Sequence, residues 1–299
     1  MLRVQTSDGE ILNTVTTLYG HSGYTGVYAL AAVANDLLAA GGSDLAVSVQ
    51  IEMPEYTFDS RLHAIQRQVK EACKLHDIEL REMTRKKHEG VALPMVTVAG
   101  VAKAPKEETW CKDTLRAGQD IVLAGYIGME GMLRILDEKE QELKKRFAPV
   151  FIEQIRSYRQ YLFAGPTISV AKAGGSSAIR QVSEGGILAA LWDLAKDADE
   201  GLDLDMKKLN ILQETIEVCE HYRINPYQLA STGCLLIVID QGEALADELN
   251  RNHIKASVIG KLTDNNDKLL HNGEEVRYID RPAPDEILKM YGGTYHGQV

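Results

Sequence analysis

The chain has 299 residues, a formal net charge of −10, 44% hydrophobic residues and 25% charged residues, which is the composition of an ordinary globular protein long enough for two domains. The acidic balance argues against nucleic acid and anionic membranes as main partners, since both need a positive surface. No stretch approaches the ~20 apolar residues that cross a bilayer. The cysteines lack the paired spacing of a disulfide or zinc framework. We therefore expect a cytoplasmic protein with reduced thiols.

The first hundred residues predict strands interleaved with two helices. An Asp8-Gly9 turn favours an initial hairpin, and the segment 27–38 is a helix that is apolar on nearly every face. A helix of that kind is expected to lie between layers or in an interface. The elements expected are a hairpin over 2–6 and 10–15, the helix over 27–38, a strand over 45–51, a helix over 59–73 and strands over 78–80 and 95–101.

The rest of the chain predicts a second domain. Residues 104–118 are polar and contain Pro105, so we place the boundary there and expect domains over 1–104 and 119–299. Mixed helices and strands without strict βαβ alternation favour an α+β fold. The elements expected are strands over 121–125, 202–204, 235–239 and 256–259, helices over 130–147, 184–196, 213–222 and 242–250, a helix ending near 161, and a turn at Asn272-Gly273.

Three glycine-bearing loops could hold an anion at the start of a helix. In the segment 183–186, Ser183 can cap a helix while Gly185 and Gly186 leave its first N–H groups open to a ligand. The alternative, that these glycines only permit close packing, is favoured when the segment is taken alone. The loop 20–26 lacks the lysine of a phosphate-binding loop, and 174–177 is explained by the end of a helix.

Asn35 and Asp36 are polar residues in an otherwise apolar helix. Burying an unpaired carboxylate is costly, so Asp36 is expected to pair with a backbone donor, a cation or a bound metal. A structural partner and a functional role are equally favoured by this argument. The eight histidines show no metal-binding spacing, and no arrangement of residues predicts a catalytic nucleophile.

Several strings, taken in their order, resemble the aminoimidazole ribonucleotide (AIR) synthetase, or PurM-like, superfamily, and its hydrogenase maturation factor (HypE-like) branch in particular. The similarity runs from about Gly20 to Ile287. The strings that carry it are Ala34-Asn35-Asp36-Leu37-Leu38-Ala39-Ala40-Gly41, Val182-Ser183-Glu184-Gly185-Gly186-Ile187, Glu214-Thr215-Ile216, Cys219-Glu220, Asn225-Pro226-Tyr227, Ser231-Thr232-Gly233 and Ile259-Gly260-Lys261.

The resemblance implies an N-terminal domain that dimerises through its sheet and a C-terminal α+β domain. It implies ATP and Mg²⁺ as cofactors, and phosphorylation of an amide-type or carbamoyl-type oxygen. It assigns Asn35 and Asp36 to the family's Asn-Asp pair, with Asp36 as a metal ligand. It assigns Ser183, Gly185 and Gly186 to the phosphate side of the site.

The sequence also departs from the family pattern. The family's Gly-x-Asp-Asp-Ala string is absent, an expected aspartate falls near Thr16, and Gln181 replaces another beside Arg180. The segment 81–84 replaces the Gly-Gly-x-Thr string, and the chain ends Tyr295-His296-Gly297-Gln298-Val299 where the maturation factor ends in a cysteine. Because Mg²⁺ is held by carboxylates, these losses predict weak Mg-ATP binding and little turnover.

The leading hypothesis is therefore a catalytically degenerate protein that binds an anion or a nucleotide, with Arg180 beside the helix start at 183–186 as a phosphate contact. It would act as a homodimer through the N-terminal domain, or as a partner subunit of an intact relative. The alternative is an active Mg-ATP-dependent synthetase or kinase in which Asp36, Glu52 or Glu184 are rebuilt metal ligands.

Overall fold

The computed structural model describes residues 1–7, 9–105 and 114–292. These residues form two compact units. Met1–Thr109 and Leu136–Arg146 make up the first unit, and Trp110–Ile135 and Phe147–Val299 make up the second. The helix α3 (Met129–Arg146) is shared between them and is kinked at Lys139. The split into domains 1–104 and 119–299 stays a prediction.

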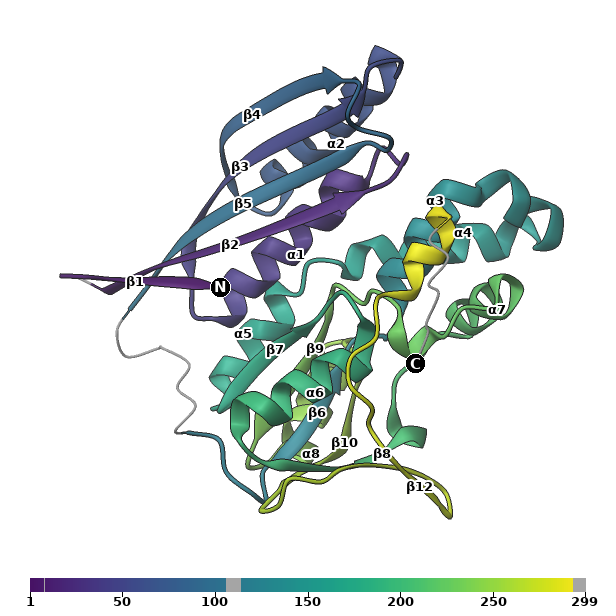
Figure 1. Cartoon of the computed structure of the whole chain (residues 1–299). Helices are drawn as coiled ribbons and strands as arrows, with labels where there is room; N and C mark the ends of the chain where they lie inside the picture. Colours follow the sequence, from purple (N-terminus) through teal and green to yellow (C-terminus); the bar gives the residue numbers. More distant parts are fainter. Residues whose placement is uncertain (8, 106–113, 293–299) are drawn as a thin grey trace. The chain divides into compact units, whose positions relative to one another are not determined.

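The first unit is a sheet of order β1-β2-β5-β3-β4 with two helices on one face (Figure 1). Its elements are β1 (Leu2–Thr6), β2 (Gly9–Tyr19), α1 (Thr25–Ala39), β3 (Ser43–Pro54), α2 (Asp59–Leu75), β4 (Glu79–His88) and β5 (Met95–Ala104). Thr6 pairs with Gly9, which confirms the initial hairpin. The strands β3 and β4 are parallel because α2 crosses between them, whereas β5 is antiparallel to β2 and β3.

Helix α1 is the buried centre of the first unit. It packs on β2, β5 and α2, and most of its residues are buried, as its apolar sequence predicts. The helix lies so close to the sheet that a Cβ on Gly100 would be 2.3 Å from a methyl of Val33. The apolar surface of α1 is thus covered within the chain, so it does not by itself require a second subunit.

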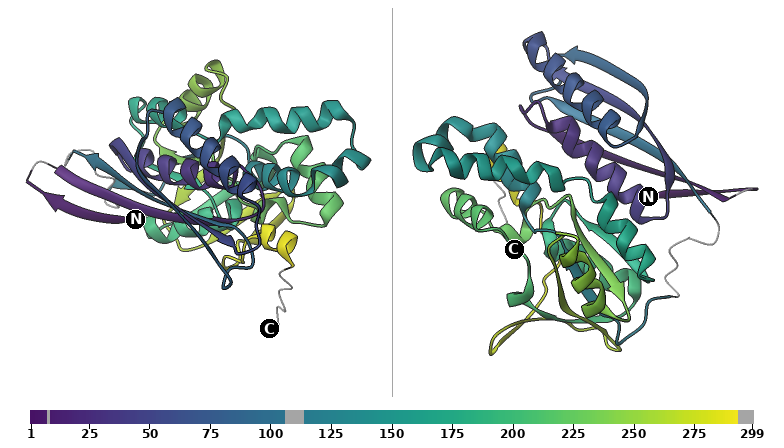
Figure 2. Two further views of the ribbon diagram at one scale, coloured as in Figure 1. Left: turned by 90° about the horizontal axis from the view of Figure 1, so that it is seen from above. Right: turned by 180° about the vertical axis from the view of Figure 1, so that it is seen from behind.

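The second unit is a sheet of order β12-β11-β8-β10-β6-β9-β7 with helices on both faces (Figure 2). Its strands are β6 (Asp120–Ala124), β7 (Ala178–Val182), β8 (Gly201–Asp205), β9 (Cys234–Ile239), β10 (Ala256–Thr263), β11 (Lys268–Asn272) and β12 (Glu275–Tyr278). Its helices besides α3 are α4 (Pro149–Ser157), α5 (Gly165–Ala173), α6 (Gly186–Ala198), α7 (Gln213–Tyr222) and α8 (Gly242–Arg251), with short 3-10 turns at Tyr158–Tyr161, Met206–Lys208, Pro226–Gln228 and Glu286–Tyr291.

The core of the second unit explains why its central strands are apolar throughout. All residues of β9 are buried, because α6 covers one face of the sheet and α8 packs on the other. Ile121 and Leu123 of β6 point into the cluster beneath α6, together with Leu191 and Leu194 of that helix. The α+β fold class is confirmed. The sequence interpretation did not include α5 and β7, whose residues are few and show little alternation.

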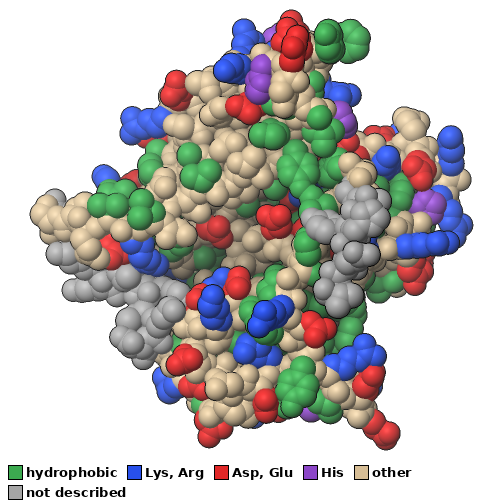
Figure 3. Space-filling view, in the orientation of Figure 1, with side chains coloured by type: hydrophobic (Ala, Val, Ile, Leu, Met, Phe, Trp, Pro, Cys, Tyr) green, Lys and Arg blue, Asp and Glu red, His purple; other side chains and the backbone are tan. Residues whose placement is uncertain are grey.

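Charge is distributed without a single dominant sign on the face drawn in Figure 3, where Lys and Arg side chains are interspersed with Asp and Glu. Within the described ranges, no helix is both long enough and apolar enough to span a bilayer. Cys73, Cys219 and Cys234 are free and buried, and burial raises the pKa of the Cys73 thiol to about 11. Cys111 lies outside the described residues. Thiols of this kind are packing residues rather than nucleophiles.

Candidate functional site

The loop between β7 and α6 is the segment in which the sequence predicts an anion site. Gly185 and Gly186 both have positive φ, +79° and +68°, which favours glycine at each position. The N-cap of α6 is Gly185, and Ser183 does not cap the helix through its side chain, so that prediction is wrong. Instead, the Ser183 carbonyl accepts a hydrogen bond from the Gly186 N–H at 3.1 Å and closes a turn.

Close packing also accounts for the second glycine. A Cβ on Gly186 would lie 2.6 Å from the carbonyl oxygen of Tyr227 and 2.7 Å from the amide nitrogen of Leu229. No side chain fits between these backbone atoms. The alternative considered from the sequence, glycines that permit close packing, therefore applies to Gly186 whether or not a ligand binds nearby.

The amide of Gly185, the N-cap of α6, is already bonded to a carboxylate of the chain. The Gly185 N–H donates to Oδ2 of Asp285 at 2.8 Å, and the Ile287 N–H donates to Oδ1 at 2.9 Å. Asp285 is 2% exposed. Burial raises the pKa of its carboxyl to about 6, although the two backbone donors act in the opposite direction. The N-cap amide of α6 thus has an anionic partner within the chain.

A buried ion pair lies next to Asp285. Oε1 of Glu130 is 3.3 Å from Nη1 of Arg134, and Oε2 of Glu130 accepts a hydrogen bond from the Thr232 N–H at 3.2 Å. Both side chains are almost completely buried. The charge of Glu130 raises the pKa of Asp285 and the charge of Arg134 lowers it. One guanidinium therefore serves two buried carboxylates, an arrangement that the sequence interpretation missed because the residues are far apart in the chain.

Arg180 is not brought to this helix start. Its guanidinium forms an ion pair with Asp197 and lies 3.9 Å from Oδ2 of Asp193. Asp197 is eleven residues beyond Gly186 in α6, a separation of about 16 Å along a helix axis. Arg180 therefore does not contribute to the helix start at Gly185 and Gly186. It pairs with an acid of α6 instead of contacting a bound phosphate.

Asn35 and Asp36 lie in the last turn of α1. Asn35 is 1% exposed and Asp36 is half-buried, and both side chains engage in interactions with other residues. Within residues 1–7, 9–105 and 114–292, no three His, Cys, Asp or Glu side chains gather closely enough to hold a metal ion. Asp36 is thus a single carboxylate without a preformed set of protein ligands around it.

The loop 20–26 at the start of α1 also binds carboxylates of the chain. Oε1 of Glu138 accepts hydrogen bonds from the His21 N–H at 2.5 Å and the Ser22 N–H at 3.2 Å. Oδ2 of Asp137 accepts from the Ser22 hydroxyl at 2.8 Å and from the Tyr28 hydroxyl at 2.7 Å. The charged segment of α3 thus supplies two acids that bind the loop before α1 and Tyr28 of that helix.

The second unit also contains a cavity that is not lined by the residues at the start of α6. It has a volume of about 360 Å³, within the range of small-molecule sites. Aromatic rings and one lysine contribute to its wall: Tyr126, Tyr161, Phe163 and Lys255. Burial is the main cause of the raised pKa of Tyr126, and the neighbouring Tyr161 and Tyr158 add to it. The cavity combines apolar rings with a cation, which is typical of sites for charged molecules that carry a ring.

The comparison with known families decides the affiliation of the chain. Residues 116–271 match the family described as AIR synthase related protein, C-terminal domain, which is more than half of the sequence. The chain belongs to this family. The PurM-like resemblance seen in the sequence is thereby confirmed.

Relatives place this family member in the HypE-like branch. It is 24% identical to a putative hydrogenase expression/formation protein of Methanocaldococcus jannaschii, over 96% of this chain and 84% of that protein. It is 24% identical to the carbamoyl dehydratase HypE of Rhodobacter capsulatus, over 78% of this chain and 66% of that protein. The hydrogenase maturation branch that the sequence resembles is thus the correct one.

Solved structures agree in fold. HypE of E. coli, a hydrogenase maturation protein, superposes with a TM-score of 0.78 at 19% identity, covering 93% of this chain and 88% of that one. A HypE in complex with ATP has a TM-score of 0.75 at 14% identity, covering 96% and 89%. The structure of a HypE–HypF complex has a TM-score of 0.72 at 17% identity, covering 91% and 90%.

Proposed function

We propose that this HypE-like protein binds a nucleotide or another phosphate-bearing ligand without ordinary Mg-ATP-dependent turnover, and that it works as a partner subunit. The observation that supports this most directly is the Asp285 carboxylate bonded to the Gly185 amide at 2.8 Å. A phosphate at this helix start would need to displace a buried carboxylate that already has two backbone donors. Two anions cannot share one helix amide.

The metal side of the site supports the same proposal. Mg²⁺ prefers oxygen ligands and is usually held by one or two carboxylates together with phosphate oxygens. Asp36 is the carboxylate that remains at the position the resemblance assigns, and no metal-holding cluster surrounds it among the described residues. The residues present do not fit a preformed magnesium site, so we derive no reaction step through one.

The proposal is tested by titrating ATP into the full chain with and without Mg²⁺, and by measuring phosphate release. We expect any ATP binding to be independent of Mg²⁺ and phosphate release to equal that of a protein-free control. ATP could occupy the aromatic-lined cavity beside Tyr161, in which case replacing Tyr161 with alanine weakens binding. Tight binding that requires Mg²⁺, together with phosphate release, would contradict the proposal.

An active Mg-ATP-dependent synthetase or kinase is the second candidate, because the chain shares its fold with a HypE that binds ATP. Asp36, Glu52 and Glu184 are the acids that would rebuild a metal site. Glu52 already accepts a hydrogen bond from Gln50 at 2.8 Å and lies 3.8 Å from His88. If turnover is found, Glu52→Gln and Glu184→Gln should lower it while the surface variant Glu243→Gln should not.

We further propose that the chain forms a homodimer through the open face of the first sheet. Val15 and Val101 are 55% and 41% exposed on neighbouring strands of that face. Burying such residues is a common source of dimer stability. Light scattering at micromolar concentration should give a dimer, and Val15→Asp with Val101→Asp should give a monomer. The matched control is Val276→Asp, since Val276 is 50% exposed in the second unit.

A partner of a different sequence is the other form of assembly that the family suggests, because a HypE–HypF complex is known. If light scattering shows this chain to be a monomer, the homodimer proposal is wrong and a heteromer is the remaining arrangement. Mixing the purified chain with an intact HypE-like relative and measuring the mass of the mixture then tests that arrangement directly.

A further inference from the structure

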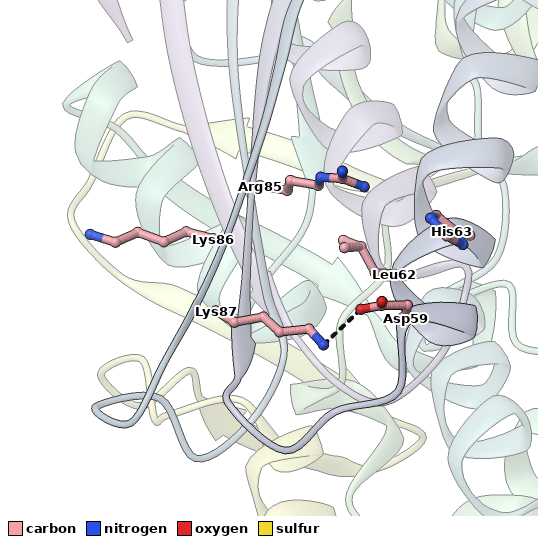
Figure 4. Close-up of a pocket in the computed structure, with 6 residues that line it drawn as sticks. All are labelled: Asp59, Leu62, His63, Arg85, Lys86 and Lys87. Carbon is pink, nitrogen blue, oxygen red and sulfur yellow. Dashed lines mark ion pairs between the residues drawn. The ribbon is translucent and has the colours of Figure 1, made fainter.

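A cavity of about 320 Å³ lies in the first unit between α2 and β4 (Figure 4). It is outside residues 116–271, which the family description covers. Its walls come from the first turns of α2 and from the last residues of β4, and they carry mostly basic side chains: Asp59, Leu62, His63, Arg85, Lys86 and Lys87.

The register of β4 explains which basic side chains face the cavity. Arg85 pairs with Ile51 of β3 and Lys87 pairs with Met53, both of which are buried on the helix-covered face of the sheet. Successive residues of a strand point to opposite faces. Arg85 and Lys87 therefore extend towards α2, whereas the Lys86 side chain extends away from it (Figure 4).

The cavity holds more positive than negative charge. Asp59 is its one acid, and its carboxylate lies 2.7 Å from Nζ of Lys87. The hydrogen bond and the charge of Lys87 are the main causes of a lowered pKa of Asp59, with further contributions from His63 and Arg85. The Arg85 guanidinium forms no ion pair with any acid in the described part of the chain. Asp59 offsets the charge of Lys87, so the charge of Arg85 gives the cavity a net positive charge.

The backbone at the start of α2 also favours a negatively charged ligand. The cavity adjoins the first turn of α2, a helix of 17 residues whose N-terminal amides carry partial positive charge. Phe58 is the N-cap and no side chain caps the helix. Asp59, the first residue of α2, does not cap the helix, and its side chain pairs with Lys87. The N-terminal partial charge, the arginine and the lysine thus act on one small volume.

We propose that this cavity binds the phosphate group of a small phosphorylated molecule, with Arg85 as the principal donor and Lys87 as the second. A guanidinium offers two parallel N–H groups that match phosphate oxygens, and lysine adds a point charge. The volume is at the lower end of small-molecule sites, and Leu62 is the apolar side chain of the lining. The phosphate, rather than a large ring, is the part held. Asp59 competes with it for Lys87.

The test is a calorimetric titration of the full chain with pyrophosphate in metal-free buffer at low ionic strength, with inorganic phosphate as a second probe. Arg85→Gln should weaken pyrophosphate binding by about tenfold or more, as expected for a charged hydrogen-bonding partner. Arg81→Gln is the matched control, because Arg81 is an exposed arginine of the same strand that does not line the cavity. Asp59→Asn should strengthen binding, since it removes the competing carboxylate.

Each outcome bears on the proposal. Saturable binding that Arg85→Gln weakens and Arg81→Gln leaves nearly unchanged supports it, and stronger binding of pyrophosphate than of phosphate identifies a polyphosphate ligand. Absence of saturable binding in the parent overturns it, as does equal weakening by the two variants. Both side chains are exposed, so neither substitution should unfold the chain. The result does not depend on ATP binding or turnover, which are measured separately.

Discussion

Helices α1 and α6 both begin after a strand and a glycine-bearing loop, and backbone amides that precede each helix donate to a carboxylate of the chain. At α1 the acid is Glu138, 117 residues from His21 in sequence and half-buried. At α6 it is Asp285, 100 residues from Gly185 and 2% exposed. A loop that could bind an anion before a helix can thus be filled by a carboxylate of the protein itself, and the burial of that carboxylate determines how much its pairing matters for stability.

The loss of a hydrogen-bonding or charged partner is expected to cost more stability at the start of α6 than before α1, because the carboxylate at α6 is more deeply buried. Water can replace a hydrogen bond at α1, because its acids are partly exposed. At α6 an unpaired charge would remain in a low dielectric, where the loss of one partner is costly. Substitutions around Asp285 are therefore expected to have larger effects than substitutions around Glu138.

The largest effect is expected from Arg134→Met. It leaves the buried carboxylates of Glu130 and Asp285 without their cation, and breaking a buried pair in this way costs about 3–5 kcal/mol. Urea unfolding monitored by circular dichroism measures the change in the free energy of unfolding. The control is Arg251→Met, whose ion pair with Glu248 is largely exposed and is expected to contribute about 0–1 kcal/mol. Equal effects at the two positions would contradict the importance of burial.

The second effect is a pH dependence that comes from Asp285. Its folded pKa of about 6 lies above the usual 3.8, so the folded state binds the proton more tightly than the unfolded state. The stability that this proton contributes is fully present below pH 3.8 and is lost as the pH rises through about 6. A shift of this size corresponds to roughly 2–3 kcal/mol over the window.

Urea unfolding at a series of pH values checks this dependence. The free energy of unfolding of the parent, minus that of Asp285→Asn, should fall as the pH rises through about 6. Asparagine does not ionise, so subtracting the free energy of unfolding of the variant cancels the pH dependence that comes from all other groups. A difference that stays constant with pH, or that increases, would show that the carboxyl is not perturbed in this direction.

A smaller effect is expected at the start of α1. Tyr28→Phe removes the hydroxyl that donates to Asp137 at 2.7 Å and should cost about 1–2 kcal/mol. Thermal unfolding measures it, and Tyr278→Phe is the control because Tyr278 is 67% exposed. A cost above that of Arg134→Met would reverse the order that the comparison of the two helices predicts.

The smallest effect is expected from Arg180→Gln. The pair with Asp197 is partly exposed and should contribute about 0.5 kcal/mol. Because Arg180 lies near the far end of α6, the thermal stabilisation of the chain by phosphate should be the same in the variant and the parent. Loss of that stabilisation would revive the role of Arg180 as a phosphate contact, which the sequence suggested.

Sequence patterns that depend on near neighbours predicted much of the fold. Alternation and turn residues identified β3, β9 and the hairpin at Asn272-Gly273, and helical periodicity gave α7 with its observed bounds, Gln213–Tyr222. The AIR synthase-related affiliation followed from strings whose order is preserved along the chain. Short elements such as β7 were missed, because a strand of five residues at the edge of a sheet carries little pattern.

The sequence by itself determined that glycine-bearing loops precede α1 and α6, that Gly185 and Gly186 stand at the start of α6, and that the chain is acidic. Only the tertiary structure decided which charges meet. Arg180 was expected at Gly185 and pairs with Asp197, and Asp285 was not considered for the Gly185 amide that it binds. The physical reason is that hydrophobic periodicity is local, whereas a charged side chain takes whichever opposite partner the packing of distant segments brings within about 4 Å.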